Sequence, residues 1–222
     1  MTDPRPAWLE RFATMEQRPL PEWFREFAPP PAPPRRSAVL ILFGSAGEGL
    51  GEDVVLTERS RDLRSHAGQV SFPGGGLDDG DEGLVHAALR EAQEEVGIDP
   101  DSVEVVSELP TVYMSFSGQA ITPVLGWWRD PHAIGVVDER EVARVARVPV
   151  SDLVEPAARF TVYHPAGFMG PGFEADGLFI WGFTATLLAT VLDVAGISKP
   201  WDPEVRREIP DHVASAWMKG RA

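Results

Sequence analysis

Three glutamates lie close together in the run REAQEEVGI, at Glu91, Glu94 and Glu95. A helix turns by about 100° per residue, so positions i, i+3 and i+4 fall on one of its faces. Three carboxylates on one face repel each other unless a positive group lies among them. Mg²⁺ or Mn²⁺ would suit that place, because hard divalent cations prefer oxygen ligands. A solvated acidic helix face is the alternative interpretation of the same residues.

The same segment contains the signals of a helix that would position these acids. Six apolar residues recur at helical spacing and should pack away from the acids: Leu84, Val85, Ala88, Leu89, Ala92 and Val96. We therefore predict a helix from about Glu82 to Val96. Asp78, Asp79 and Asp81 would supply its N-cap and first-turn acids, and Gly97 would end it in a left-handed conformation.

A longer pattern surrounds the glutamates and resembles the Nudix box of the Nudix hydrolases. It consists of Gly76, five residues, Glu82, seven residues, and then REAxEExGI from Arg90 to Ile98. Ala92 departs from the larger aliphatic residue that is usual at its position. The glycine loop allows two registers, because Gly75 paired with Asp81 is an alternative to Gly76 paired with Glu82. The resemblance favours metal binding over a solvated acidic face.

A second motif precedes this box. The sequence LTERSxxxRxxxGxxxFPGG, residues 56–75, resembles the motif of the coenzyme A diphosphatase branch of the same family. A looser likeness continues through residues 121–124 and 179–184. The resemblance implies an enzyme that hydrolyses the diphosphate bond of coenzyme A or acyl-CoA. The products would be 3′,5′-ADP and 4′-phosphopantetheine, free or acylated.

The resemblance also implies roles for single residues of the box. Glu94 and Glu95 would be the principal metal ligands, and Glu91 would be a third ligand or the catalytic base. The carbonyl oxygen of Gly76 would complete the metal site, while Arg90 would orient the carboxylates. Such a site would position a water molecule for in-line attack on phosphorus and lower its pKa.

Two arginines and two glycines upstream of the helix are candidates for substrate binding. Arg59 and Arg64 could bind phosphate, because a guanidinium binds phosphate oxygens bidentately and coenzyme A carries a 3′-phosphate besides its diphosphate. A surface ion pair is the alternative for either arginine. Gly74 and Gly75 belong to the phosphate-side loop, and the Gly75 carbonyl is the metal ligand in the second register.

A downstream acidic loop offers a further candidate for proton transfer. Members of the family often use an acid from such a loop as a ligand or base, and the run DEREV contains Glu139 and Glu141. We prefer Glu141, with a solvated loop as the alternative for both. His66 could contact phosphate, but we expect it to be an ordinary loop residue.

The composition agrees with a soluble enzyme that has one main domain. The chain has 222 residues, 43% of them hydrophobic, which is enough for a full core. It contains no cysteine, which excludes disulfides, thiolate metal sites and a catalytic thiol. The formal net charge of -14 repels nucleic acids and anionic membranes, and it would repel a phosphorylated substrate unless local cations overcame it. We expect a small-molecule substrate, with no nucleic-acid or membrane partner.

Neither a signal sequence nor a membrane span is expected. The first residues lead into no apolar signal core, so we expect a cytoplasmic protein. The uncharged stretch between Asp176 and Asp193 is shorter than the roughly 20 residues of a membrane-spanning helix. We predict a buried strand at residues 178–183 followed by a core helix at residues 184–195.

The chain divides into three predicted regions. Residues 1–36 form an N-terminal appendage that ends in a Pro-rich linker, which would be an extended spacer rather than an SH3-type ligand. Residues 37–198 form the Nudix-type domain, and residues 199–222 form an extension with a docking helix or a homodimer contact. The glycine-rich stretch 44–51 is expected to be a hairpin loop.

The predicted order of elements favours the α/β class. Strands are expected at residues 38–43, 53–59, 69–72, 103–109, 120–128, 160–163 and 178–183. Strands interrupted by one strong helix, then more strands and a closing helix, are typical of an α/β/α sandwich around a mixed β-sheet. The Nudix resemblance implies the same fold.

Three functions remain compatible with these residues. The first is the coenzyme A diphosphatase described above. The second is the same chemistry on ADP-ribose or a dinucleotide, in which case Arg59 and Arg64 would be structural. The third is a catalytically idle Nudix-fold binding module, although all the box carboxylates of an active enzyme are present.

Overall fold

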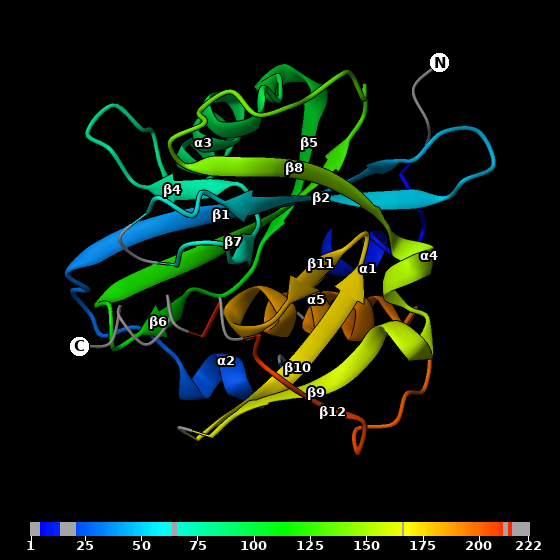
Figure 1. The fold of residues 1–222 in the computed structure, drawn as a ribbon. Coiled ribbons are helices and arrows are strands. Elements are labelled where there is room, and N and C mark those ends of the chain that lie inside the picture. The colour runs from blue at the N-terminus through cyan, green and yellow to red at the C-terminus, as the bar shows by residue number, and fades with distance from the viewer. Residues whose placement is uncertain (1–4, 14–20, 64–65, 166, 211–212, 215–222) are drawn as a thin grey trace. The chain divides into compact units, whose positions relative to one another are not determined.

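The computed structural model describes residues 5–13, 21–63, 66–165, 167–210 and 213–214. These residues form two compact units, each built from two stretches of the chain. Unit 1 comprises Met1–Ser45 and Phe72–Val137, and unit 2 comprises Ala46–Ser71 and Asp138–Ala222. Both units combine strands with helices (Figure 1). The three predicted regions of the chain remain predictions.

Unit 1 contains a mixed sheet. Its strands are β1 Arg35–Ser45, β4 Gly74–Gly76, β5 Val103–Glu108, β6 Val112–Met114 and β7 Gln119–Trp128. The long central strands β1 and β7 run parallel, from Arg35 opposite Gln119 to Gly44 opposite Trp128. The short strands pair antiparallel, β4 with β1 and both β5 and β6 with β7. The predicted α/β class with a mixed β-sheet is thereby confirmed.

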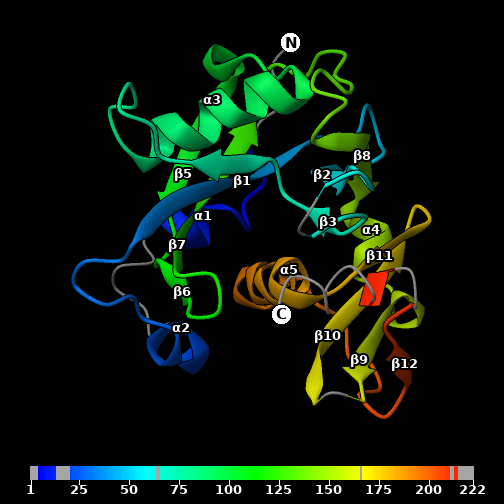
Figure 2. The same ribbon diagram turned by 60° about the vertical axis from the view of Figure 1, so that its left-hand side comes forward.

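Helix α3, Leu84–Val96, lies against β1 and β4 of this sheet (Figure 2). It begins two residues later than predicted, and the predicted aspartate N-cap is wrong, because Gly83 occupies that position without a side-chain cap. The end at Gly97 is confirmed, with φ 80° in the left-handed region. Ala88, Ala92 and Val96 are buried as predicted. Small residues at this contact let the helix approach the strands closely.

The described N-terminal residues pack onto unit 1. They form the short helices α1, Glu10–Ala13, and α2, Glu22–Glu26. Phe12 is buried, and the Trp8 ring meets the Phe43 ring edge-on at 5.0 Å between centroids. Arg5 adds an ion pair with Glu104 at 2.7 Å. These described residues therefore contribute to the packing of unit 1.

Unit 2 contains two groups of strands. The first comprises β2 Glu52–Arg59, β3 Val70–Ser71 and β8 Val142–Pro149, with β2 pairing antiparallel to both others. The second is a four-stranded sheet in the order β11 Leu178–Ile180, β10 Phe168–Ala175, β9 Arg159–His164 and β12 Arg206–Glu208. Helix α4, Val150–Leu153, follows β8, and helix α5, Gly182–Ala195, packs against β10. Residues 46–51 form a loop, which is shorter than the predicted loop 44–51 because β1 continues to Ser45.

The apolar segment before Asp193 forms a strand and a core helix in the predicted order, but the strand is shorter than predicted, because β11 ends at Ile180 and α5 begins at Gly182 rather than at Thr184. Most of α5 is buried because nearly all its residues are apolar or small. Among the described residues, no helix is long and apolar enough to cross a membrane.

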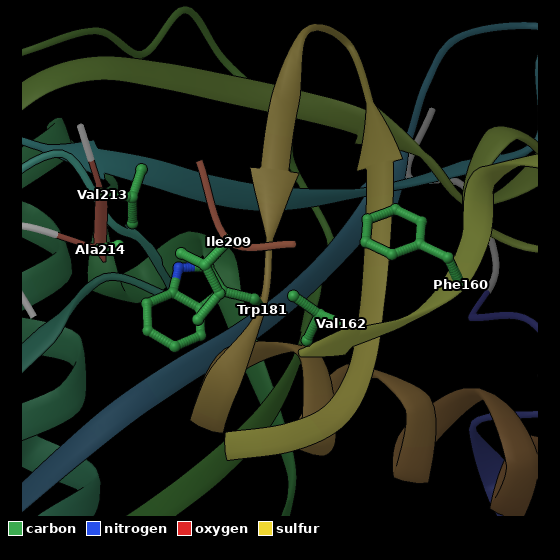
Figure 3. Close-up of a cluster of buried hydrophobic side chains, with 6 residues drawn as sticks. All are labelled: Phe160, Val162, Trp181, Ile209, Val213 and Ala214. Atoms are coloured by element: carbon green, nitrogen blue, oxygen red, sulfur yellow. The ribbon is translucent and has the colours of Figure 1, made fainter. Parts of the chain in front are cut away.

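The C-terminal extension is described at residues 199–210 and 213–214, and the last two of these are helical. Its described part forms strand β12, which pairs in parallel with β9. Ile209 and Val213 are buried beside Trp181 and Phe160 in one apolar cluster (Figure 3). The docking helix stays a prediction, because most of the residues that would form it lie outside the described part of the chain. Trp217 lies outside the described residues.

Candidate active site

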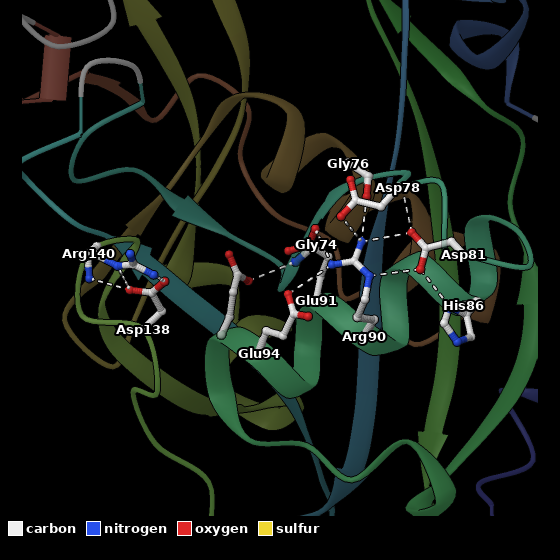
Figure 4. Close-up of polar contacts among 11 residues, drawn as sticks. Gly74, Gly76, Asp78, Asp81, His86, Arg90, Glu91, Glu94, Asp138 and Arg140 are labelled. Carbon is white, nitrogen blue, oxygen red and sulfur yellow. Dashed lines mark hydrogen bonds and ion pairs between the residues drawn. The ribbon is translucent and has the colours of Figure 1, made fainter.

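Arg90 lies at the centre of the polar contacts on α3 (Figure 4). Its Nη1 donates to Glu91 Oε1 and to Glu94 Oε2, each at 3.1 Å. Its Nη2 donates to the carbonyl oxygen of Gly76 at 2.9 Å. The positive group next to these oxygens in this structure is therefore the guanidinium. Arg90 contacts two of the three box carboxylates, and its orienting role stays a prediction.

Asp81 anchors Arg90 from the other side. Arg90 Nε and Nη2 donate to the two carboxylate oxygens of Asp81 at 3.0 Å each, and the Asp81 side chain is only 1% exposed. His86 Nδ1 lies 2.7 Å from Asp81 Oδ1, and the amide of Asp78 donates to Oδ2. Of the two acids that the sequence left open, Asp81 rather than Glu82 makes these contacts with Arg90.

This pairing changes the proton affinities of both groups. Hydrogen bonds from Arg90, followed by one from the Asp78 amide, hold the pKa of Asp81 well below its usual range. The hydrogen bonds to Asp81, with the nearby charge of Glu91, raise the pKa of Arg90 above its usual value. Both groups are therefore ionised throughout the neutral range.

The glycine strand β4 meets two of the glutamates. The amide of Gly74 donates to Glu95 Oε2 at 3.1 Å. A Cβ on Gly75 would lie 2.6 Å from Glu91 Oε2, and nearer still to Oε1. A Cβ on Gly74 would lie 2.6 Å from the backbone Cα of Val39. Glycine at position 74 lets β4 lie close to β1, and glycine at position 75 leaves room for the Glu91 carboxylate.

The three glutamates differ in environment, which corrects the prediction that all of them face away from the packed side. Glu95 is 4% exposed and lies with the packed residues, whereas the Glu94 side chain is 58% exposed. The reason is angular, because neighbouring residues of a helix differ by about 100°. Glu95 points towards the sheet, Glu94 towards solvent, and Glu91, 17% exposed, lies between them.

The oxygen atoms around Arg90 are chemically suited to bind a hard divalent cation. Glu91, Glu94 and the Gly76 carbonyl supply only oxygen atoms, which Mg²⁺ and Mn²⁺ prefer. Glu91 rests directly over Gly75, where a Cβ would displace it. In this structure the same oxygens bind Arg90, and among the described residues no three acidic or histidine side chains are grouped to hold an ion. The metal assignment therefore rests on donor chemistry and stays a prediction.

A loop that the sequence did not single out holds the C-terminal end of α3. The amide of Val137 donates to the Glu95 carbonyl at 3.0 Å, and the amide of Gly135 donates to the Val96 carbonyl at 3.2 Å. His132 Nε2 lies 3.2 Å from the Gly97 carbonyl oxygen. The amides of Val137 and Gly135 thereby satisfy two carbonyls that a helix end leaves without partners. No periodicity or turn signal in residues 132–137 predicts this role.

The remaining candidates lie in unit 2. Arg59 Nη2 lies 3.9 Å from Glu141 Oε2, and the Glu141 side chain is half exposed. Arg64 lies outside the described residues. His66 is a loop residue, as expected, and its Nδ1 lies 2.9 Å from Gln69 Oε1. The roles of Arg59, Arg64 and Glu141 stay predictions.

The acidic loop itself is a tight turn. Arg140 Nε and Nη2 donate to both carboxylate oxygens of Asp138, at 2.9 and 2.6 Å. These bonds lower the pKa of Asp138 and raise the pKa of Arg140. Asp138 thereby shapes the turn that leads into Glu141, while Glu139 is exposed, as in the solvated alternative.

The sequence of this chain matches a protein-family profile and several curated proteins. The profile of the NUDIX domain family matches residues 33–168. Uncharacterized Nudix hydrolase NudL of Citrobacter koseri is 43% identical over 162 residues, which cover 69% of this chain and 79% of that protein. A protein of the same name from Shigella flexneri is 36% identical over 202 residues, or 87% of this chain and 98% of that protein.

Solved structures with a similar chain path include a Nudix hydrolase from M. smegmatis, RenU. It is 25% identical, covers 53% of this chain and 74% of its own, and gives a TM-score of 0.43. The NUDIX domain of Shewanella oneidensis NrtR, solved with ADP ribose, has the same coverage and TM-score at 21% identity.

Proposed function

This chain belongs to the Nudix hydrolase family, and from that premise we propose that it hydrolyses the diphosphate bond of coenzyme A or acyl-CoA. The family membership makes it a pyrophosphohydrolase. The observation that carries the narrower proposal is the motif over residues 56–75, in which Arg59 and Arg64 precede the glycines Gly74 and Gly75. The products would be 3′,5′-ADP and 4′-phosphopantetheine, free or acylated.

Metal binding is the first part of the proposed mechanism. Glu94 and Glu95 would be the principal ligands, with Glu91 and the Gly76 carbonyl completing the oxygen set. The Mg²⁺ or Mn²⁺ ion would neutralise diphosphate charge and lower the pKa of an attacking water. Gly74 supports this proposal by fixing Glu95, because its amide donates to the carboxylate at 3.1 Å.

The chain's own residues orient the reacting groups. Arg90 holds Glu91 and Glu94 at 3.1 Å, and Asp81 fixes Arg90 through two hydrogen bonds. A fixed guanidinium is pre-organised, so its carboxylate partners need little rearrangement when substrate arrives. Glu141 would act as the base that takes the proton from water, with Glu91 as the alternative base.

Substrate choice would depend on the arginines. Among the described residues, the Arg59 side chain, 24% exposed, contacts Glu141 at 3.9 Å and its Nε has no hydrogen-bond partner, which leaves donors for phosphate. Arg64 would assist it. The chain would act in the cytoplasm on a small molecule, as a monomer or homodimer.

Purified protein with Mg²⁺ should cleave coenzyme A and acyl-CoA in preference to ADP-ribose and NADH, with products identified by mass spectrometry. Comparison of coenzyme A with 3′-dephospho-CoA tests whether the 3′-phosphate is read. Preferential cleavage of ADP-ribose or a dinucleotide would replace the coenzyme A assignment with the alternative substrate class. No cleavage of any compound would support an idle binding module.

A further inference from the structure

Two buried donors lie side by side in unit 2 without acceptors. Among the residues that the structure describes, neither Arg59 Nε nor Gln69 Nε2 has a hydrogen-bond partner. A buried donor that lacks an acceptor costs roughly 1–3 kcal/mol. Such a cost is normally avoided, so two examples on neighbouring residues indicate a place that an acceptor from outside the chain can fill.

The strands bring the two donors together. The β2–β3 register runs from Thr57 opposite Ser71 to Glu58 opposite Val70, so its next pair is Arg59 and Gln69. The amide of Arg59 donates to the Gln69 carbonyl at 2.9 Å, which continues the ladder by one step. Side chains directly opposite in an antiparallel pair lie on the same face. Arg59 and Gln69 therefore present their donors to the same side of the strands.

A strand irregularity brings Glu141 to the same arginine. The pairing of β2 with β8 shifts between Glu58 and Arg59, so that Arg59 is opposite Val142. The amide of Ser60 donates to the Glu141 carbonyl at 2.7 Å. Bulges of this kind redirect side chains and are common beside active sites. The result is the Arg59–Glu141 contact of 3.9 Å, too long for a hydrogen bond.

We propose that Arg59 and Gln69 form a phosphate-binding subsite, and that Glu141 competes with the phosphate for Arg59. The Nε and Nη2 of one guanidinium match two oxygens of a phosphate, and the Gln69 amide adds a third donor. Glu141 occupies Arg59 only loosely while the subsite is empty. An arriving phosphate takes over the guanidinium and releases the carboxylate. Gln69 is the new member of this site.

The competition between phosphate and Glu141 for Arg59 would link substrate binding to catalysis. This link rests on the proposed function of Glu141 as a base. A phosphate on Arg59 would free that base only when the correct substrate is bound. Binding energy from a remote phosphate would then raise turnover rather than affinity alone. A substrate that lacks this phosphate would leave Glu141 held by Arg59.

Calorimetry without metal, using 3′,5′-ADP, 5′-ADP and 5′-AMP, tests the subsite. Arg59→Gln should weaken the preferred nucleotide about ten-fold or more, and Gln69→Leu about five-fold, because each loses charge-assisted hydrogen bonds. Glu141→Gln should tighten it by about two- to five-fold, since the competing pair is partly exposed. Preference for 3′,5′-ADP assigns the subsite to the 3′-phosphate. Preference for 5′-ADP assigns it to the diphosphate and overturns the coupling to a remote phosphate.

Matched controls are available on the same strand end. Arg61 and Glu58 form an ion pair at 3.8 Å, so Arg61→Gln and Glu58→Gln make the same charge changes without touching the subsite. Neither control should alter nucleotide affinity by more than about two-fold, since surface pairs contribute little. If Glu58→Gln and Glu141→Gln changed nucleotide affinity equally, the change would come from the lost negative charge alone. That result would overturn the proposed competition between Glu141 and phosphate. Unchanged affinity in Gln69→Leu would overturn the subsite.

A kinetic measurement distinguishes this inference from the proposed function. If the competition operates, 3′-dephospho-CoA has a lower kcat than coenzyme A, and Arg59→Gln brings the ratio of the two kcat values towards one. A change in KM alone would contradict the coupling. Nucleotide binding that follows the predicted variants without any hydrolysis of coenzyme A would leave the subsite standing while refuting the proposed function.

Discussion

Replacing Gly75 with alanine should damage the reaction while sparing the fold. A Cβ at this position would lie 2.6 Å from Glu91 Oε2, so the carboxylate must move by about 1 Å to reach normal contact. The obstructing atoms are the end of a flexible side chain, so the backbone can stay in place. Misplacing a catalytic group by about 1 Å can cost roughly 10²-fold in rate, or about 2.7 kcal/mol of transition-state stabilisation.

Two other glycines provide the comparison. At Gly74 a Cβ would lie 2.6 Å from the Val39 backbone and nearer to the Ala38 carbonyl, so Gly74→Ala should destabilise the fold by about 1–3 kcal/mol or more. At Gly80 a Cβ meets nothing within 4 Å, so Gly80→Ala should be close to neutral. Thermal unfolding and diphosphate hydrolysis would be measured for all three variants.

The expected pattern is specific to the position of Glu91. Gly75→Ala should keep a melting temperature within a few degrees of the wild type and lose about two orders of magnitude in kcat. Full activity in this variant would refute the functional importance of the Glu91 position. A collapse in stability equal to that of Gly74→Ala would show that Gly75 serves the fold instead.

Three further predictions concern ionisable groups. Glu94→Gln and Glu95→Gln should each lower turnover by several orders of magnitude with the fold intact, since a lost metal removes several kcal/mol of transition-state stabilisation; near-normal rates in both would exclude these ligands. Hydrogen bonds from Arg90 lower the pKa of Asp81 in the folded chain. The Asp81–Arg90 pair therefore stabilises the folded state fully above the unfolded-state pKa of about 3.9, and this stabilisation is lost as pH falls below that value. Urea unfolding of Asp81→Asn should therefore show a weaker loss of stability in acid, and an unchanged acid profile would contradict this. The stability contribution of Asp53 should depend on pH in the opposite direction, because burial raises its folded-state pKa despite its pair with Arg147. Asp53 should stabilise the folded chain most below a pH of about 4 and less as pH rises. Asp53→Asn should remove that decline in the same urea unfolding series.

The strongest elements could be predicted from local pattern. Helix α3 has helical spacing of apolar residues and a terminal glycine, and its end at Gly97 was predicted correctly. Its packed face was predicted only in part, because Glu95 lies on that face as well. The strands β1, β2, β5, β7 and β9 have β-branched and aromatic runs bounded by turn residues. These signals lie within a few residues of each other, so the chain alone reveals them.

Other elements have no such signal. Strand β4 is three glycines, which favour no strand by themselves, and it forms because β1 offers a partner. Strand β12 has the charged sequence RRE and is fixed by β9 and by the burial of Ile209 nearby. Their conformations come from long-range pairing, and propensity within a window of neighbouring residues cannot reveal it.

The sequence by itself determined which chemical groups this protein has and how they are spaced: three carboxylates on one helix, an arginine beside them, and glycines before them. Only the tertiary structure decided their surroundings. It buried Glu95 against Gly74, left Glu94 in solvent, and chose Asp81 as the partner of Arg90. The physical reason is that helical periodicity sets the direction of a side chain, whereas strand pairing sets what that side chain meets.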